Sequence, residues 1–228
     1  MNPSRLSWPD PDYLLQQRRR LPSHKFRRLH LNFPGLPEGS AFQPDPVMSA
    51  VARGVSVRLR EAHLEYRAFV DMSGGSSDDA VLAIGHEDDG RAVLDRVVNQ
   101  GPEPPFDPRM AVERFVGILR EYGVATVMGD RYAGETFRTD FERHGIRYEL
   151  ATETRSELYE ALEPCLNSSR VVLVDIAVLE QQLLGLTWCG GKIDHPNGEH
   201  DDYANAAAGV VRALIGDALN DGRGVLQQ

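Results

Sequence analysis

A change of hydrophobic periodicity halfway along the chain constrains the fold more than any other feature of the sequence. In the first half, apolar residues follow a strand-like pattern over residues 63–72, 80–84 and 92–98. The Asp89-Gly90 pair between the second and third runs is a turn signal, which predicts an antiparallel hairpin. We therefore expect three sequential antiparallel strands, with the first in a central position of the sheet.

In the second half, helical and strand-like patterns alternate. Asp107-Pro108 predicts the start of a helix that ends at Gly123, and a Thr154/Glu157 capping box predicts another. Further helices are expected to end at His144-Gly145, to span residues 155–166, to begin after a cap at Asp175 and to begin at Asp201-Asp202. Further strands are expected over residues 124–128, 146–150 and 171–174. This order predicts an α/β domain, in which a mixed sheet of three antiparallel strands followed by parallel strands carries helices on both faces.

The N-terminal region differs from the rest in charge and composition. Residues 1–34 carry seven Lys/Arg and two Asp, a net charge of +5, whereas the other residues carry 18 basic and 32 acidic groups, a net of −14. We interpret residues 11–31 as a helical, basic segment. Residues 33–47 contain six Pro or Gly, a density that predicts a linker. The expected division is a basic segment with linker over 1–49 and a compact domain over 50–228.

Composition excludes several classes of protein. Hydrophobic residues make up 41% and charged residues 26%, as in soluble globular proteins. We expect no membrane span and no signal peptide, because no sufficiently long apolar run is present. Cys165 and Cys189 form neither a zinc pattern nor a disulfide framework, which favours a reducing compartment. Walker A and Gly-x-Ser-x-Gly patterns are absent, so we expect no P-loop ATP site and no serine hydrolase elbow.

Four aspartates stand where loops leave the predicted elements. Asp71 ends an apolar strand, Asp130 follows another, and Asp201 and Asp202 open the last helix. Taken singly, each is better explained as a turn residue or a helix cap. Together they would meet if central strands ended at one side of the sheet. Carboxylates are ligands of hard cations such as Mg²⁺, and two such ions can stabilise the attacking and leaving oxygens of a displacement at phosphorus.

Nearby residues give weaker candidates. His200 could coordinate a metal or orient a ligand, and an ordinary surface histidine fits equally well. Asp78 and Asp79 follow the Gly74-Gly75 turn, where we favour turn roles, with Asp79 a weaker candidate to support a metal ligand. The net charge of −9 is unusual for a protein that acts on DNA. Bound cations would invert the local charge, although an acidic surface that keeps the protein soluble explains most of the excess.

Several motifs, taken in order, resemble one known family. They are residues 26–32 (FRRLHLN), 69–75 (FVDMSGG), 128–134 (MGDRYAG), 156–159 (SELY), 193–196 (IDHP) and 200–206 (HDDYANA). In this order they resemble the nuclease domain of phage terminase large subunits, over about residues 14–218. The His-Asp-Asp-x-x-Asn-Ala element is the most specific of them. The resemblance implies a ribonuclease H-like fold and an endonuclease that cuts concatemeric double-stranded viral DNA during genome packaging.

The same resemblance implies a set of metal ligands. By motif position, Asp71, Asp130 and Asp202 would bind Mg²⁺ or Mn²⁺, with two ions expected, and Asp201 would be a fourth ligand, acting through water. Arg155 falls in a stretch that lies near the site in that family, which makes it a candidate phosphate contact. The carboxylates would then carry out two-metal-ion phosphodiester hydrolysis.

The resemblance also implies partners and a place of action. They are double-stranded DNA, a terminase ATPase domain, a small subunit and a portal, in the host-cell cytoplasm and without a membrane. Whole terminases carry an N-terminal ATPase with Walker motifs, and this sequence has none. Translocation is therefore not carried over, and residues before 34 would be the connection to such an ATPase domain.

Two other functions remain open at this point. A Holliday-junction resolvase or transposase of the same fold would use similar carboxylates, and a strong preference for four-way junctions would distinguish it. A catalytically silent docking fragment of a packaging motor is the non-enzymatic alternative. The presence of all four carboxylates argues against a decayed site, because such a cluster repels itself without cations.

Overall fold

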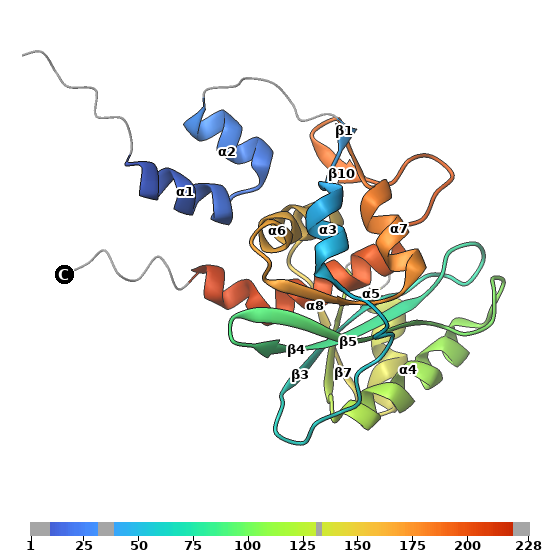
Figure 1. The fold of residues 1–228 in the computed structure, drawn as a ribbon. Coiled ribbons are helices and arrows are strands. Elements are labelled where there is room, and N and C mark those ends of the chain that lie inside the picture. Colours follow the sequence, from blue (N-terminus) through green and yellow to red (C-terminus); the bar gives the residue numbers. More distant parts are fainter. Residues whose placement is uncertain (1–9, 32–38, 131–133, 221–228) are drawn as a thin grey trace, which may run out of the picture.

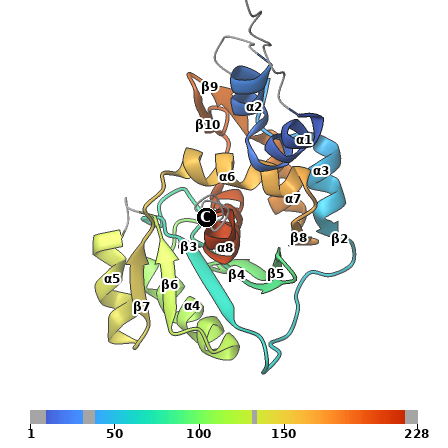
Figure 2. The same cartoon turned by 90° about the vertical axis from the view of Figure 1, so that its left-hand side faces the viewer.

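The core of the protein is a seven-stranded mixed sheet (Figure 1), with the strand order β2-β8-β5-β4-β3-β6-β7 (Figure 2). The computed structural model describes residues 10–31, 39–130 and 134–220. The strands of this sheet are β2 (Val51–Ala52), β3 (Tyr66–Asp71), β4 (Val81–Asp88), β5 (Arg91–Asn99), β6 (Thr126–Gly129), β7 (Arg147–Leu150) and β8 (Val171–Val174).

The first three long strands form the predicted antiparallel meander. Asp89 and Gly90 have φ values of 48° and 76°, the left-handed conformation that a two-residue hairpin turn needs. β3 pairs antiparallel with β4 and parallel with β6, so it lies inside the sheet as expected. β7 and β8 add parallel to β6 and β5, which confirms the predicted mixed sheet.

Helices cover both faces of the sheet, as predicted (Figures 1 and 2). The helices are α1 (Pro11–Arg20), α2 (Ser23–His30), α3 (Pro44–Ala50), α4 (Pro108–Tyr122), α5 (Gly134–Arg143), α6 (Arg155–Asn167), α7 (Ala177–Gly185) and α8 (Asp202–Asn220). α4 and α5 pack with one apolar core cluster, and α3, α6, α7 and α8 pack with the other. None of the described helices is long and apolar enough to cross a membrane.

Local signals explain why two of these helices begin and end where they do. The Asp107 carboxylate accepts a hydrogen bond from the amide of Arg109, and Gly123 ends α4 with φ 71°. At the start of α6 the Thr154 amide donates to the Glu157 carboxylate at 2.7 Å, and the Thr154 hydroxyl accepts from the Glu157 amide at 3.4 Å. The predicted capping box is therefore confirmed.

Helix α8 lies close against β3 because one of its residues has no side chain. A Cβ atom built on Gly209 would stand only 2.2 Å from Cγ of Phe69, a fully buried residue of β3. One helical turn earlier, Asn205 donates a hydrogen bond from Nδ2 to Oδ2 of Asp71 at 2.8 Å. The two contacts, four residues apart on the helix and two on the strand, lie on one face of each element.

The predicted linker over residues 33–47 is wrong in its second half. β1 (Gly39–Ser40) pairs with β9 (Thr187–Cys189), which pairs with β10 (Lys192–Asp194) in a separate three-stranded sheet that the sequence analysis missed. α3 follows, because Pro44 and Pro46 fall in its first turn, where no amide hydrogen is needed. Phe42 and Val47 are buried in the core. The packed domain thus includes residues from 39 onward, and residues 32–38 lie outside the described part.

The expectation that Asp175 caps α7 is also wrong. The N-cap is Ile176, whose side chain makes no capping hydrogen bond. The Asp175 carboxylate instead accepts a hydrogen bond from the amide of Gly54 at 2.8 Å and pairs with Arg53 at 3.2 Å. Asp175 therefore fastens the loop after β2 to the end of β8, a contact between residues far apart in the sequence.

The predicted basic helical segment forms two helices, α1 and α2. α1 contacts α6, so the segment lies on the outside of the layer that covers one face of the sheet (Figure 2). Lys25 of α2 pairs with Glu160 of α6 at 2.5 Å. Tyr13 and Leu15 of α1 and Leu29 of α2 remain exposed.

Candidate metal centre

The four predicted aspartates lie in one pocket at the end of the central strands. Val70 of β3 pairs in parallel register with Gly129 of β6, so Asp71 and Asp130 stand next to each other where the two strands end. The start of α8 brings Asp201 and Asp202 to the same place, and all four line a pocket of about 420 Å³. We call it the aspartate pocket; its other titratable lining residues are Asp78, Arg155, His195, Glu199 and His200.

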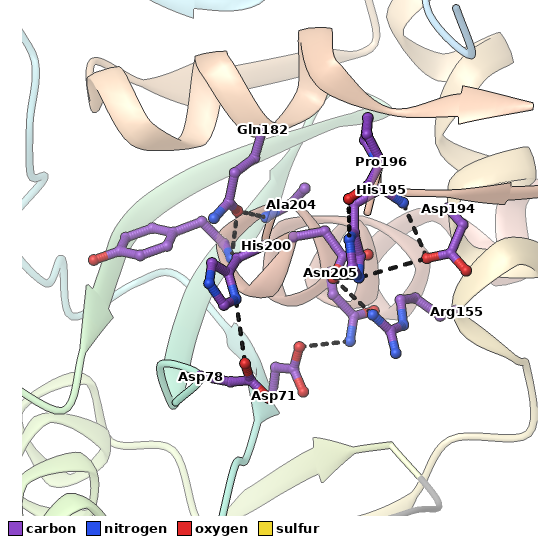
Figure 3. A network of polar contacts seen from close by, with 12 residues as sticks. Asp71, Asp78, Arg155, Gln182, Asp194, His195, Pro196, His200, Ala204 and Asn205 are labelled. Carbon is purple, nitrogen blue, oxygen red and sulfur yellow. Dashed lines mark hydrogen bonds and ion pairs between the residues drawn. The ribbon is translucent and has the colours of Figure 1, made fainter. Parts of the chain in front are cut away.

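Asp71 is a buried carboxylate in a negative environment. Burial raises its pKa well above the usual range, and the nearby Asp130 and Asp202 raise it further. The hydrogen bond from Asn205 opposes this shift by stabilising the charged form (Figure 3). A bound cation would stabilise the ionised form of the Asp71 carboxylate, and the ionised form is the one that binds a metal.

The pKa of Asp202 is raised as well. Burial raises its pKa to about 6, and repulsion from Asp201 and Asp78 adds to the shift. His200 acts in the opposite direction. The imidazole Nδ1 of His200 lies 3.2 Å from Oδ1 of Asp78, at the rim of the pocket (Figure 3). His200 therefore contacts a neighbouring carboxylate, and its predicted role as a metal ligand remains a prediction.

Asp201 is a pocket residue whose two carboxylate oxygens already have partners. Oδ1 accepts a hydrogen bond from Nη1 of Arg155 at 2.6 Å, and Oδ2 accepts one from the Tyr159 hydroxyl at 2.7 Å. The side chain is only 2% exposed. Asp201 therefore fastens α6 to the start of α8, whose first amides, those of Tyr203 and Ala204, donate to Oε1 of Gln182 (Figure 3).

Arg155 is the one arginine that lines the aspartate pocket among the described residues. Burial lowers its pKa, but the nearby Asp201, Tyr159 and Asp71 more than offset this and leave the pKa above its usual value. The side chain is 43% exposed. A guanidinium has five N–H donors, so the bond to Asp201 leaves others for a ligand. Its position agrees with the predicted phosphate contact, which stays a prediction.

In the described part of the chain, Asp78 lines the aspartate pocket and Asp79 does not, and the weaker candidacy of Asp79 to support a metal ligand stays a prediction. Asp79 is absent from the described lining of the pocket; its carboxylate accepts hydrogen bonds from Gln100 at 2.7 Å and Asn99 at 3.2 Å, which ties the loop to the end of β5. Asp78 does line the pocket, while its backbone carbonyl accepts from Ser73. A loop aspartate thus serves both as a turn residue and as part of the pocket wall.

The sequence analysis did not single out His195. Its Nδ1 lies 3.0 Å from the carbonyl oxygen of Pro196, and its Nε2 lies 3.8 Å from Asp194 and 3.9 Å from Asp201 (Figure 3). These three residues can bring one ligand atom each within 4.8 Å of one another. The Ile-Asp-His-Pro motif includes this histidine, but a motif of four residues is too short to indicate what the histidine does.

A second missed feature lies beneath Asp130. The Tyr148 hydroxyl is buried and has no hydrogen-bond partner among the described residues. Burial and the nearby Asp130 raise its pKa. A Cβ atom on Gly129 would stand 1.9 Å from this hydroxyl, so only glycine fits before Asp130. The Tyr148 side chain therefore packs directly against Gly129 at the end of β6.

The donor set of the aspartate pocket fits a hard divalent cation. Asp71, Asp130 and Asp202 line the pocket with carboxylate oxygens, the type of ligand that Mg²⁺ and Mn²⁺ prefer. Asp71 and Asp202 both have raised pKa values, first because they are buried and second because neighbouring carboxylates repel their charge. A cation would supply the missing positive charge.

Comparisons with known proteins add the fold relationship. No family model matches the sequence, and no curated protein matches it. The solved large terminase nuclease from thermophilic phage G20c with bound magnesium is 15% identical, with a TM-score of 0.65, over 79% of this chain and 100% of that chain. That nuclease was also solved with bound cobalt and with bound zinc.

Two longer proteins are similar in structure as well. The large terminase of a second thermophilic bacteriophage is 12% identical, with a TM-score of 0.71, over 90% of this chain and 53% of that chain. The HK97 bacteriophage large terminase is 15% identical, with a TM-score of 0.58, over 86% of this chain and 49% of that chain. This chain thus spans about half the length of those two proteins. The mixed sheet with its covering helices is the ribonuclease H-like fold of large terminase nuclease domains.

Proposed function

We propose that this protein is a metal-dependent endonuclease that cuts double-stranded viral DNA during genome packaging. The observation that carries the proposal is the meeting of Asp71, Asp130 and Asp202 in one pocket at the end of the central strands. These residues come from three separate parts of the chain. The structural similarity to terminase nucleases supports the same reaction class.

The three carboxylates would hold two ions of Mg²⁺ or Mn²⁺. Such ions stabilise the charge that develops on the attacking and leaving oxygens at phosphorus and make water a better nucleophile. Asn205 would hold Asp71 in place through its hydrogen bond. Arg155 would contact a phosphate of the substrate, and Asp201 would orient Arg155. Because both oxygens of Asp201 already accept hydrogen bonds, we propose that it acts on an ion only through water.

The biological setting follows from the same proposal. The chain would work beside a terminase ATPase domain, a small subunit and a portal, in the cytoplasm of an infected or lysogenic bacterium. The two longer terminases are about twice as long as the region that this chain matches. A separate or adjoining polypeptide would then supply the motor activity.

Supercoiled plasmid tests the proposed reaction directly. We expect the 228-residue chain to convert it to nicked and linear forms with Mg²⁺ or Mn²⁺, and to leave it intact with EDTA. A parallel assay should offer a four-way junction and a linear duplex of equal length. Comparable cutting of both supports a packaging nuclease, whereas strong preference for the junction would favour a resolvase. Absence of cutting with either ion contradicts the proposal.

Thermal unfolding tests metal binding without any cleavage. Binding to the folded state at ten times Kd contributes about 1.4 kcal/mol, which should raise Tm by about 3–6 °C for a chain of this size. We expect that rise with Mn²⁺ or Mg²⁺, and we expect it to shrink in Asp202→Asn, because that variant lacks one predicted ligand. Buffer that contains EDTA and no added divalent cation is the reference. An equal rise in both proteins would place the ion elsewhere.

A further inference from the structure

We propose that a second, arginine-lined cleft on this chain holds the phosphate backbone of DNA. It lies about half a turn of a B-form duplex away from the aspartate pocket. Among the described residues, six line this cleft, which we call the arginine cleft: Arg19, Arg20, Asn167, Ser168, Ser169 and Arg170. Its volume is about 520 Å³. The choice of DNA as its occupant depends on the proposed nuclease function, although these six residues include none of those named for the aspartate pocket.

The cleft forms where the end of α1 meets the end of α6. Arg19 and Arg20 occupy the last turn of α1, and the segment from Asn167 leads from α6 into β8. Arg170 is held in place by a hydrogen bond from its Nε to the carbonyl oxygen of Gly90 at 2.9 Å. That bond leaves the two terminal nitrogens of Arg170 for a ligand. The cleft is thus built from two segments remote in sequence.

The charge of the cleft is the reverse of that of the chain as a whole. Within the described part of the chain, its lining has three arginines and no carboxylate, whereas the protein has a net charge of −9. Arg19 and Arg20 are exposed and form no ion pair with another described residue. Ser169 and Asn167 add neutral hydrogen-bonding groups. Guanidinium groups with such neighbours match phosphate oxygens, to which arginine donates in pairs.

The distance to the aspartate pocket suits a DNA duplex. α6 begins with Arg155 in that pocket and ends with Asn167 in the arginine cleft. Twelve helical steps correspond to about 18 Å, which is about five phosphates along one strand of B-form DNA. Between the two ends, Lys25 neutralises Glu160. Half a turn along the duplex the cut strand faces away from the protein, so the phosphate that would reach the arginine cleft belongs to the complementary strand.

A purely structural role explains only part of this arrangement. Basic residues in the last turn of a helix complement its negative end, which accounts for Arg18, Arg19 and Arg20 on α1. Arg170 also has a structural contact, the bond from its Nε to the Gly90 carbonyl, but that bond does not explain why its terminal nitrogens share a cleft with Arg19 and Arg20. A DNA backbone would bind the three arginines of the cleft and would also explain how an acidic domain retains its substrate.

Binding measurements in EDTA test the cleft separately from cleavage. The probe is a duplex of about 30 base pairs, roughly 100 Å long, titrated with wild type and with Arg19→Ala/Arg20→Ala at several salt concentrations. We expect the double variant to bind about tenfold more weakly, because two phosphate contacts are lost. That loss should also reduce the slope of log K against log salt by about 1.8.

A matched control removes two other exposed arginines. Arg67→Ala/Arg147→Ala lies at the starts of β3 and β7, the opposite ends of these strands from the aspartate pocket, and should bind DNA like wild type. Equal affinity and equal salt slope in the arginine-cleft variant would overturn the proposal. So would a cleft that binds millimolar inorganic phosphate, seen as a cleft-dependent rise of Tm, while DNA affinity is unchanged.

The two proposals fail in different ways. A wild type that cuts DNA, with a cleft variant that binds and cuts equally well, contradicts the cleft alone. A wild type that never cuts but binds DNA through Arg19 and Arg20 contradicts the nuclease and supports the cleft.

Discussion

Asp71→Asn should reduce DNA cleavage by about 10³-fold or more while the protein remains folded. Metal ions contribute several kcal/mol to the stabilisation of a phosphoryl transition state, and each 1.36 kcal/mol corresponds to about a factor of ten. Asp71 ends β3 and interacts electrostatically with both Asp130 and Asp202, so in the proposed site it would be the ligand best placed to contact both ions. Asparagine keeps the volume and can still accept the hydrogen bond from Asn205. The measurement is the initial rate of plasmid cleavage with Mn²⁺.

The same variant separates a catalytic from a structural role. Because burial raises the pKa of Asp71, its ionised form costs stability in the metal-free protein once the pH exceeds the ordinary pKa of an aspartate, about 4. The amide of the variant carries no such cost. Its metal-free Tm at pH 8 should therefore be equal to or higher than that of wild type, and this gain should vanish as the pH falls toward about 4. A Tm that falls together with activity would mean that the cleavage defect is a folding defect.

Asp175→Asn provides the control for the cleavage measurement. Asp175 also follows a strand of the central sheet, but it lies outside the described lining of the aspartate pocket and pairs with an exposed Arg53. Such exposed pairs contribute little to stability because water screens them, so cleavage should stay within roughly twofold of wild type. If both variants lost activity equally, the aspartate pocket would have no special role.

Most of the fold could be predicted because its signals are local. The Asp89-Gly90 turn, the Asp107 cap and the Thr154 capping box each act within four residues, and the structure confirms all three. The linker prediction failed for a related reason. A count of prolines ignores position, and Pro44 and Pro46 occupy the turn of α3 that tolerates them.

The candidate site could be predicted from the sequence only for the residues that the ends of neighbouring strands bring together. Parallel strands that end at one edge bring Asp71 and Asp130 together, as expected from their place after two apolar runs. The partners of Asp201 could not be found in this way, because Arg155 and Tyr159 reach it across 46 and 42 residues. No periodicity encodes such contacts, which depend on how α6 packs beside α8.

Gly209→Ala should lower the thermal stability of the protein and, with it, the order of the aspartate pocket. The new Cβ would meet the Phe69 ring at 2.2–2.5 Å, well inside contact distance. Both residues are fully enclosed, so α8 must move away from β3. Overpacking of this kind costs typically about 1–3 kcal/mol, and about 2–3 kcal/mol corresponds to a fall in Tm of roughly 5–10 °C at this chain length.

The displacement should also reduce the proposed cleavage, because the same helix carries residues of the proposed metal site. Asn205 lies one turn before Gly209 and reaches Asp71 at 2.8 Å, and Asp202 opens the helix. Moving α8 outward would lengthen that hydrogen bond and withdraw Asp202 from the other proposed ligands. Cleavage measured well below Tm should therefore fall by about 10–100-fold, the usual effect of disturbing the residues that orient metal ligands.

Two further variants make this expectation specific. Gly117→Ala, inside α4, has no heavy atom within 4 Å of the added Cβ, so it should raise stability by up to about 1 kcal/mol through helix propensity. Adding Phe69→Leu to Gly209→Ala removes part of the ring that blocks the new methyl group and should restore much of the lost Tm and activity. If Gly209→Ala behaved like Gly117→Ala, the close approach of α8 to β3 would not be what holds the carboxylates together.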